Sequence, residues 1–253
     1  MIARAWITGA SSGIGRALAL ALAARGAAVA ASARRAGELE ALAAEAARAG
    51  GPGRIAPFPV DVADTDAMAA AGAAIEAALG PLDLAVLNAG TYAPVDVRAF
   101  DAAAFRRAME INYLGAVNGI AAVLPRFAAR HAGQIAVVAS VAGYRGLPEA
   151  AAYGPTKAAL INLCEALKPD LDRLGVRISL VNPGFIKTPM TDRNTFPMPF
   201  LMPVEAAAQR ILAGLEKGTF EITFPRRFTF LVKLARILPY ALYFPLIRKA
   251  TGR

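Results

Sequence analysis

The chain has 253 residues, 56% of them hydrophobic and 19% charged, which suits one α/β domain with a large core and excludes a disordered chain. One cysteine (Cys164) and one histidine (His131) exclude a disulfide framework and argue against a His/Cys metal site or a Ser-His-Asp arrangement, so we expect no metal. The formal net charge is +9, and because no acidic residue follows Glu221, most of the excess lies at the C-terminus.

Three local features set further expectations. Cys164 lies in an apolar helical run and is expected in the core, and His131, beside Gly133, is expected to cap a helix end. The N-terminal sequence MIARAWITGASSG reads as a strand and a turn, without the positive region, apolar run and cleavage site of a leader. We therefore expect no signal peptide and a cytoplasmic protein.

Short apolar strands alternate with helices along the chain. The pattern predicts strands at 3–8, 28–33, 54–60, 83–88, 134–140, 176–182 and 219–224. It predicts a first helix that ends near 25 and further helices at 36–49, 64–79, 101–130, 151–174 and 204–217, with Pro169 as the place for a kink. This alternation predicts a doubly wound parallel sheet of about seven strands with helices on both faces.

The first strand runs into a glycine-rich turn, Thr8-Gly9-Ala10-Ser11-Ser12-Gly13-Ile14-Gly15. Glycines permit a tight turn and a close approach of the backbone to a pyrophosphate, while the following helix offers N–H groups and the positive end of its dipole. The turn therefore predicts a dinucleotide site that uses Gly9, Ser11, Ser12, Gly13, Ile14 and Gly15. The alternative interpretation is a glycine-rich connection without a ligand.

The second strand ends at Ala33, where a site for NAD usually carries an acidic residue, and Arg34 and Arg35 follow. Arginine pairs with a 2′-phosphate, which a carboxylate would repel. This pattern favours NADP(H) over NAD(H). The alternative is a solvated helix start, although cations are disfavoured at a helix N-terminus.

Tyr153 and Lys157 stand four residues apart on a predicted helix, so their side chains share one face. A cation one turn away is expected to lower the pKa of the phenol, which suits general acid/base chemistry. Pro155 between them is tolerated only in the first turn of a helix. Alone, the pair also fits a solvated helix face.

These motifs occur in order with Asp61-Val62, Asn88-Ala89-Gly90, Asn112, Ser140, and Pro183-Gly184 with Thr188. Over about residues 3–190 the chain resembles the short-chain dehydrogenase/reductase family in its compact single-domain form. The resemblance implies a Rossmann-like domain, which we place at 1–225, with a mobile substrate lid at 188–203. It also implies a nicotinamide cofactor and a homodimer or homotetramer.

The resemblance implies a role for each of these residues. Tyr153 would be the acid/base, Lys157 would hold the nicotinamide ribose and Ser140 the substrate carbonyl, and Asn112 would hold a water that relays protons. Around the cofactor, Asp61 and Val62 would flank the adenine, Asn88, Ala89 and Gly90 would line the cleft, and the nicotinamide would be covered by Pro183, Gly184, Ile186 and Thr188. Taken singly, Ser140 could simply close a strand and Asn112 could be an ordinary polar helix residue.

The lid segment 188–203 is rich in proline, methionine and phenylalanine. Its apolar side chains indicate a hydrophobic substrate, because methionine adapts its shape to its contacts. Ordinary packing of a loop against the body of the domain explains the same composition.

The C-terminal extension, 226–253, places leucines and aromatic residues between lysines and arginines. Its longest uncharged run, 237–247, is broken by Pro239 and Pro245 and is shorter than the roughly 20 residues that span a bilayer. The pattern is typical of helices that lie on a membrane surface, here the inner face. A subunit interface or packing against the lid is the rival interpretation, and no nucleic-acid motif is present.

The leading hypothesis is an NADP(H)-dependent oxidoreductase that interconverts a carbonyl and a secondary alcohol, on a lipophilic small molecule at a membrane surface. The alternative is a sensor or scaffold that binds NADP(H) on the same fold without chemistry. Such a protein could lose Tyr153 or Lys157, and this chain keeps both.

Overall fold

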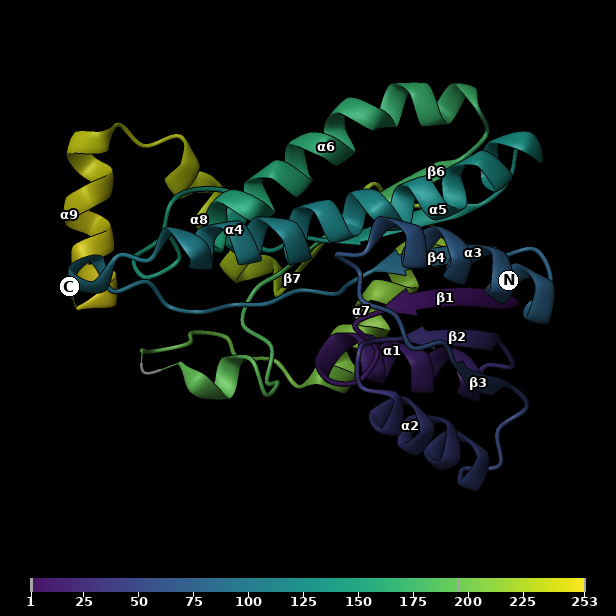
Figure 1. The fold of residues 1–253 in the computed structure, drawn as a ribbon. Helices are drawn as coiled ribbons and strands as arrows, with labels where there is room; N and C mark the ends of the chain where they lie inside the picture. Colours follow the sequence, from purple (N-terminus) through teal and green to yellow (C-terminus); the bar gives the residue numbers. More distant parts are fainter. Residues whose placement is uncertain (1, 195, 253) are drawn as a thin grey trace.

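A seven-stranded parallel sheet runs through the protein (Figure 1). In the computed structural model, which describes residues 2–194 and 196–252, the strands follow the order β3-β2-β1-β4-β5-β6-β7. They are β1 (Arg4–Thr8), β2 (Ala28–Ser32), β3 (Arg54–Pro57), β4 (Leu84–Leu87), β5 (Gln134–Val138), β6 (Arg177–Pro183) and β7 (Glu221–Phe224). The order reverses beside β1, so the predicted doubly wound parallel sheet is confirmed.

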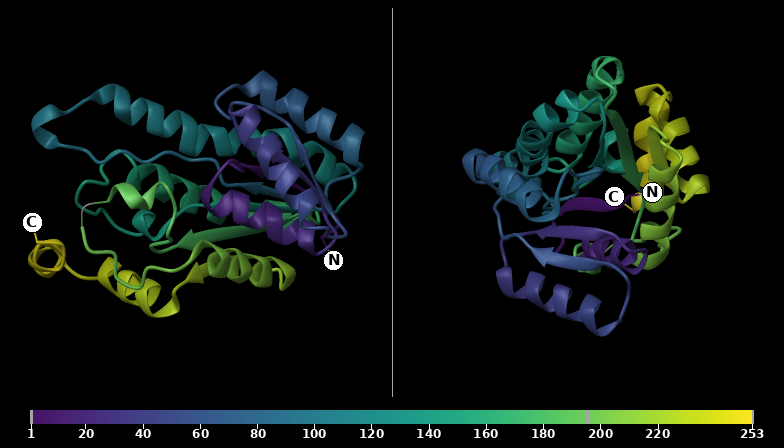
Figure 2. Two further views of the ribbon diagram at one scale, coloured as in Figure 1. Left: turned by 90° about the horizontal axis from the view of Figure 1, so that it is seen from below. Right: turned by 90° about the vertical axis from the view of Figure 1, so that its right-hand side faces the viewer.

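Helices cover both faces of this sheet, as predicted (Figures 1 and 2). One face carries α1 (Gly13–Ala24), α2 (Ala36–Arg48) and α7 (Val204–Glu216). The other carries α3 (Thr65–Leu79), α5 (Gly115–Ala129) and α6 (Gly154–Arg173).

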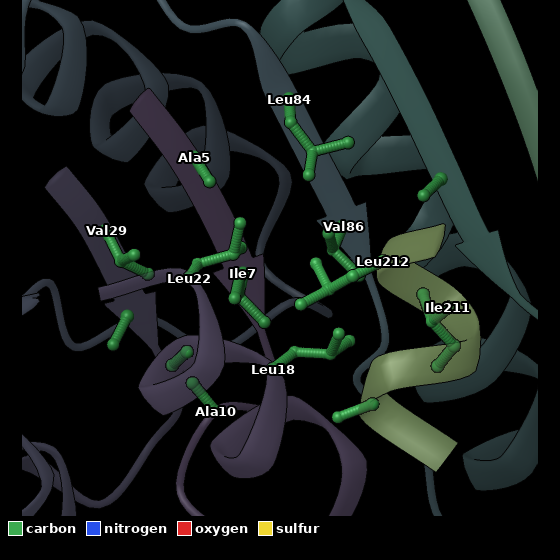
Figure 3. Packing of buried hydrophobic residues seen from close by; sticks show 14 of the residues in the cluster. Ala5, Ile7, Ala10, Leu18, Leu22, Val29, Leu84, Val86, Ile211 and Leu212 are labelled. Carbon is green, nitrogen blue, oxygen red and sulfur yellow. The ribbon is translucent and has the colours of Figure 1, made fainter. Parts of the chain in front are cut away.

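Two apolar clusters, one on each face, hold these layers together. Figure 3 shows Leu18 and Leu22 of α1 and Leu212 of α7 packing against Ile7 and Val86 of the central strands. Side chains alternate along a strand, so Trp6, the neighbour of Ile7, points into the opposite cluster. Burying side chains of this size stabilises the fold by about 1.5–3 kcal/mol each, which gives the loops at the strand ends a rigid base.

The helix expected at 101–130 is interrupted. It consists of α4 (Ala102–Met109), a π-helical turn (Glu110–Leu114) and α5. A π turn adds one residue to a helical turn without changing the apolar pattern on either side, so periodicity predicts one continuous helix. The interruption contains Asn112, one of the predicted catalytic residues.

Helix α6 begins at Gly154 rather than at 151, and Tyr153 is its N-cap residue. Pro155 lies in the first turn as predicted, where its missing N–H is not needed. The helix continues through Pro169 to Arg173. Strands β3 and β7 are shorter than predicted, at 54–57 and 221–224.

The two residues singled out by composition lie where the sequence predicts. Cys164 is fully buried, and burial raises the pKa of its thiol. His131 directly follows α5 with a φ of 51°, and its Nδ1 lies 3.3 Å from the carbonyl oxygen of Leu174. It occupies the left-handed position that ends many helices.

The extension forms two helices, α8 (Arg226–Arg236) and α9 (Tyr240–Thr251), and Arg253 lies outside the described residues. Helix α9 stands at the end of the molecule toward which the strands point (Figure 1). Of the helices within 2–194 and 196–252, none is both long and apolar enough to cross a membrane.

Candidate active site

The carboxyl edge of the sheet gathers almost all of the predicted site residues. The loops after β1, β2, β3 and β4 carry the glycine turn, Arg34-Arg35, Asp61-Val62 and Asn88-Ala89-Gly90. Because these four strands are neighbours in the order β3-β2-β1-β4, the four segments lie along one edge. Ser140 follows β5 and Gly184 follows β6, so the groups expected to do chemistry lie farther along the same edge.

The glycine turn leaves no room for side chains where the backbone turns into α1. Gly9 and Gly13 have φ angles of +66° and +55°, in the left-handed region that glycine tolerates best. A Cβ on Gly15 would lie 2.5 Å from the Gly9 carbonyl oxygen, and one on Gly9 would lie 2.8 Å from Cα of Ala89. Ser12 makes no side-chain cap to α1, so this helix N-terminus fits a phosphate group.

Asn88 fixes the shape of this turn from the neighbouring strand. Its Nδ2 donates to the carbonyl oxygens of Thr8 (3.1 Å) and Gly9 (3.2 Å). The Thr8 hydroxyl oxygen in turn accepts from the backbone N–H groups of Asn88 (3.0 Å) and Ala89 (3.2 Å). The sequence predicts that Asn88 lines the cleft, and the structure adds that its side chain holds the backbone of the glycine turn in place.

Arg35 reaches the glycine turn from the end of β2. Its Nη2 lies 3.4 Å from the Ser11 hydroxyl oxygen, and its Nη1 lies 3.6 Å from the Glu38 carboxylate. Both Arg34 and Arg35 are exposed, beside Ala33 where an acidic residue would stand in an NAD site. The Arg35 guanidinium therefore lies at the rim of the turn, and Arg34 is exposed beside it in the chain.

The residues expected around the adenine sit one loop farther out. The Asp61 carboxylate accepts from the Ala63 N–H at 3.1 Å, and Val62 is buried. A Cβ on Gly115 would lie 2.7 Å from Cγ2 of Val62, so α5 packs tightly under this loop.

The start of the lid lies next to the glycine turn. A Cβ on Gly13 would lie 3.3 Å from Cγ2 of Thr188, which places Thr188 over the N-terminus of α1. Ile186 is buried and pairs with Met202, and Pro183 and Gly184 close β6. The predicted nicotinamide cover therefore lies between the glycine turn and the end of β6.

The Ser140 hydroxyl lies beside the phenol of Tyr153 and acts on its pKa. Ser140 begins a short 3₁₀ turn, Val141–Gly143, and its hydroxyl oxygen accepts from the Ala142 N–H at 3.1 Å. Burial raises the pKa of Tyr153 to about 12, while the nearby Ser140 hydroxyl acts in the opposite direction. The expectation of a lowered pKa is thus wrong for the protein alone, because loss of solvent is the largest effect on Tyr153 and Lys157 is not among the causes.

Lys157 is a buried cation, with 3% of its surface exposed. Its Nζ donates to the Val138 carbonyl oxygen at 2.8 Å and lies 5.5 Å from the ring centroid of Tyr153. Burial lowers the pKa of Lys157 to about 8. The sequence predicts the pair on one face of α6, and the structure adds that a backbone carbonyl holds the ammonium.

Asn112 is buried in the π turn and is fully engaged. Its Oδ1 accepts from the Thr91 N–H (2.7 Å), and its Nδ2 donates to the Thr91 carbonyl (3.0 Å) and the Thr156 hydroxyl (3.0 Å). A Cβ on Gly90 would lie 3.3 Å from Asn112 Oδ1 and 3.6 Å from Lys157 Nζ. Glycine at 90 therefore keeps open a space that borders both residues, while the Asn112 side chain ties α6 to the loop after β4.

A cavity of about 270 Å³ opens in front of Ser140 and Tyr153. Met190 and Phe196 of the lid line it, together with Phe185 just before the lid. The opposite wall comes from the extension, through Phe228 and Val232 of α8 and Ile247, Ala250 and Thr251 of α9. The cavity thus joins two hydroxyl groups to a largely apolar lining.

A family model described as short chain dehydrogenase matches residues 3–197, which is more than half of the chain. The chain belongs to the short-chain dehydrogenase family. The chain is 40% identical over 239 residues to an uncharacterised oxidoreductase of Myxococcus xanthus, covering 94% of each.

Two further comparisons extend this relationship. Estradiol 17-beta-dehydrogenase 1 of the rat is 34% identical over 177 residues, which cover 69% of this chain and about half, 51%, of that protein. A crystal structure of a short-chain dehydrogenase/reductase from Burkholderia phymatum in complex with NAD superposes with a TM-score of 0.84 at 24% identity, covering 92% of each chain. This last similarity concerns the fold.

As a short-chain dehydrogenase, the protein is an oxidoreductase that acts with a nicotinamide cofactor. The glycine turn, with its left-handed glycines and uncapped helix N-terminus, fits the phosphates of such a group. In the described ranges, no cluster of three His, Cys, Asp or Glu side chains could hold a metal ion.

Sequence reasoning missed several residues of this dehydrogenase's site. The ring of Tyr92 meets that of Tyr153 edge-on, with centroids 5.3 Å apart and an interplanar angle of 81°. The position of Tyr92, two residues after Gly90 at a strand end, was a usable signal. No local pattern marks the backbone carbonyl of Val138, or the residues of α8 and α9 that line the cavity.

We predict that Lys157→Met removes a pH dependence of stability. In the unfolded chain Lys157 holds its proton up to its ordinary pKa of 10.5, whereas the folded protein releases it from about 8. Raising the pH through this window therefore favours the folded state, by about 3 kcal/mol for a shift of this size. Urea unfolding between pH 8 and pH 10 should show the wild-type free energy of unfolding rising relative to that of Lys157→Met.

Lys168→Met, at a partly exposed lysine of the same helix, is the control, and its difference from wild type should stay level with pH. Parallel curves for wild type and Lys157→Met would contradict the burial argument.

Proposed function

We propose that this dehydrogenase interconverts a carbonyl and a secondary alcohol of a lipophilic substrate, with NADP(H) as its cofactor and as a homodimer or homotetramer. The observation that carries the proposal is the cavity, where the hydroxyls of Ser140 and Tyr153 face phenylalanine, methionine and aliphatic side chains. The lining also contains Glu149, Thr191 and Asn194. A few polar groups in a largely apolar pocket suit a molecule with a carbonyl or hydroxyl on an apolar body. Estradiol, in the name of the rat relative, carries a secondary alcohol on an apolar body.

The proposed chemistry divides between the cofactor and three side chains. NADPH supplies the hydride when it is bound. The Ser140 hydroxyl holds the substrate oxygen, and Tyr153, whose raised pKa keeps it protonated at neutral pH, donates a proton to that oxygen. Lys157, with a pKa near 8, can return a proton through water in the space beside Gly90 and Asn112.

We predict that Tyr153→Phe lowers kcat by about 1,000-fold or more with any ketone that the wild type reduces, because the proton donor is lost. The affinity for NADPH should stay within about threefold of wild type, since the ring is kept. NADPH oxidation with a panel of ketones measures kcat, and fluorescence titration measures the affinity for NADPH.

Tyr240→Phe, at a tyrosine 71% exposed, is the control and should retain wild-type turnover. Full activity of Tyr153→Phe would refute the acid role. A wild type that binds NADPH but reduces no carbonyl compound in the panel would point to the sensor or scaffold.

The choice of NADP(H) rests on Arg34 and Arg35. Arg35 lies 3.4 Å from Ser11 in the glycine turn. Both arginines follow β2, and the end of the second strand is where a dinucleotide site usually reads the ribose 2′-position. Bidentate pairing with a phosphate suits arginine.

We predict that Arg34→Ala/Arg35→Ala weakens NADPH binding by about 10–100-fold, the loss expected for one or two hydrogen bonds to a charged group. NADH binding should change by less than about threefold, because NADH has no 2′-phosphate. Arg48→Ala, at an exposed arginine at the end of α2, is the control. An equal loss of affinity for both cofactors would contradict the assignment.

The outer face of the extension supports contact with a membrane. Phe230, Ile237 and Tyr240 are 68%, 76% and 71% exposed, and arginine and lysine flank them without any acidic residue after Glu221. Such a face suits an anionic lipid surface, into which apolar side chains insert while the cations meet headgroups. We place this contact at the inner face of a membrane, where the cavity would receive lipophilic substrate.

We predict that the wild type co-sediments with phosphatidylcholine vesicles that contain phosphatidylglycerol, and less with pure phosphatidylcholine. Phe230→Ser/Ile237→Ser should lower the bound fraction about tenfold, because two exposed apolar anchors are lost. Arg48→Glu/Arg54→Glu, at the β3 edge of the sheet, opposite the β7 edge that α8 contacts, should bind as wild type does. Equal and negligible binding by all three proteins would exclude the membrane contact.

A further inference from the structure

Three consecutive residues of the segment that joins Ser140 to Tyr153 bind the C-terminal helices. They are Tyr144, Arg145 and Gly146. We propose that Arg145 is a positioning residue that latches α9 to the end of α8 over the cavity and so determines which substrates fit. For its kinetic consequence, the inference rests on the carbonyl reduction proposed above.

Arg145 caps the end of α8. Its Nη1 lies 2.5, 3.0 and 2.7 Å from the carbonyl oxygens of Ala235, Arg236 and Leu238. These carbonyls belong to the last turn and the connection to α9, where helix acceptors lack their usual partners, although the Ala235 carbonyl also accepts from the Leu238 N–H at 3.3 Å. A cation is favoured there, because the negative end of the helix dipole points at it.

The same guanidinium holds α9. Its Cζ lies 3.8 Å from the ring centroid of Tyr243 and 5.1 Å from that of Tyr240. Tyr243 is the buried residue of α9, and its hydroxyl donates to the Gly146 carbonyl oxygen. Most of the rest of α9 is exposed, so its position depends on this one cluster.

The latch decides where one wall of the cavity stands. Ile247, Ala250 and Thr251 line the cavity and follow Tyr243 at intervals of four, seven and eight residues, so they share its helix face. If Tyr243 leaves its place, this face moves with it. The segment that carries Arg145 also links Ser140 to Tyr153, so the wall and the reacting groups are held by one stretch of chain.

A separate contact holds α8, which makes the role of Arg145 specific. Lys233 of α8 pairs with Glu221 of β7, and the Tyr144 hydroxyl donates to the same carboxylate. Phe228 at the start of α8 also packs on Phe185, with ring centroids 5.3 Å apart. These contacts do not involve Arg145, so its loss should release α9 while α8 stays on the sheet.

The test replaces Arg145 by Met, which keeps the length of the side chain. Hydrogen exchange by mass spectrometry should be about tenfold faster or more in 240–251 and unchanged in α6 and the sheet, because a charged cap and a cation–π contact are lost. With NADPH, KM for a steroid ketone should rise about tenfold or more relative to KM for cyclohexanone. The smaller ketone does not contact the wall of the cavity that α9 forms, so its KM should not depend on that wall. The Kd for NADPH should not change.

Arg130→Met is the matched control. The Arg130 guanidinium also binds backbone carbonyls, of Leu82 and Ala132, and lies 4.7 Å from the Phe127 ring, but at the amino edge of the sheet. It should leave both exchange in 240–251 and the KM ratio unchanged. Arg145→Lys keeps the charge and loses the planar guanidinium. Its exchange rate in 240–251 and its KM ratio should fall between those of wild type and Arg145→Met.

Tyr243→Leu provides a second route if Arg145→Met does not fold, and it should release α9 to the same extent. Wild-type exchange in 240–251 in Arg145→Met or Tyr243→Leu would overturn the latch. An unchanged KM ratio alongside fast exchange would overturn its role in selectivity. If the wild type reduces no ketone, only the proposed function fails, and exchange alone decides the latch.

Discussion

The site depends on an ammonium group held away from water. Lys157 is 3% exposed, and its Nζ binds the carbonyl oxygen of Val138 at the end of β5. Removing a cation from water costs several kcal/mol, and a single carbonyl returns only part of that. The protein tolerates the arrangement because α6 is fixed by Leu160, Cys164 and the central strands. The same burial brings the pKa of Lys157 down to about 8, close to the pH at which the proposed mechanism would use it to return a proton.

Other features of the site are also locally unfavourable for folding. Gly9, Gly13 and Gly15 weaken the chain locally but let the backbone approach a phosphate. A π turn breaks the helix at Asn112 and turns this side chain toward Thr91 and Thr156. Tyr153 is kept neutral by the loss of solvent that also favours an apolar substrate. Of these features only Tyr153 lines the cavity, together with Ser140, and the glycine turn, Asn112 and Lys157 lie outside its lining.

The sequence predicts the sheet and most of the cleft, because local patterns record them. Alternating apolar strands give the seven-stranded parallel sheet, and its topology brings Gly9, Arg35, Asn88 and Ser140 to one edge. What it missed depends on contacts between distant segments. The far wall of the cavity comes from residues more than 70 positions after Tyr153, and the rise in the pKa of Tyr153 reflects how deeply a whole loop buries it. Tail composition left a surface helix and packing against the lid as alternatives. The structure shows Phe228 of α8 against Phe200 of the lid, with ring centroids 6.2 Å apart, and both C-terminal helices line the pocket.

The most direct test of this account measures protons taken up when NADPH binds. Ribose oxygens and phosphates near Lys157 should favour the charged form of the lysine, so binding of NADPH should raise the pKa of Lys157. This rise predicts uptake of up to about 0.7 of a proton per chain at about pH 8.5. Calorimetric titration in two buffers of different ionisation enthalpy gives this number, and Lys157→Met should abolish it. No uptake by the wild type, or the same uptake by Lys157→Met, would contradict the claim that a buried, partly neutral lysine is the centre of the site.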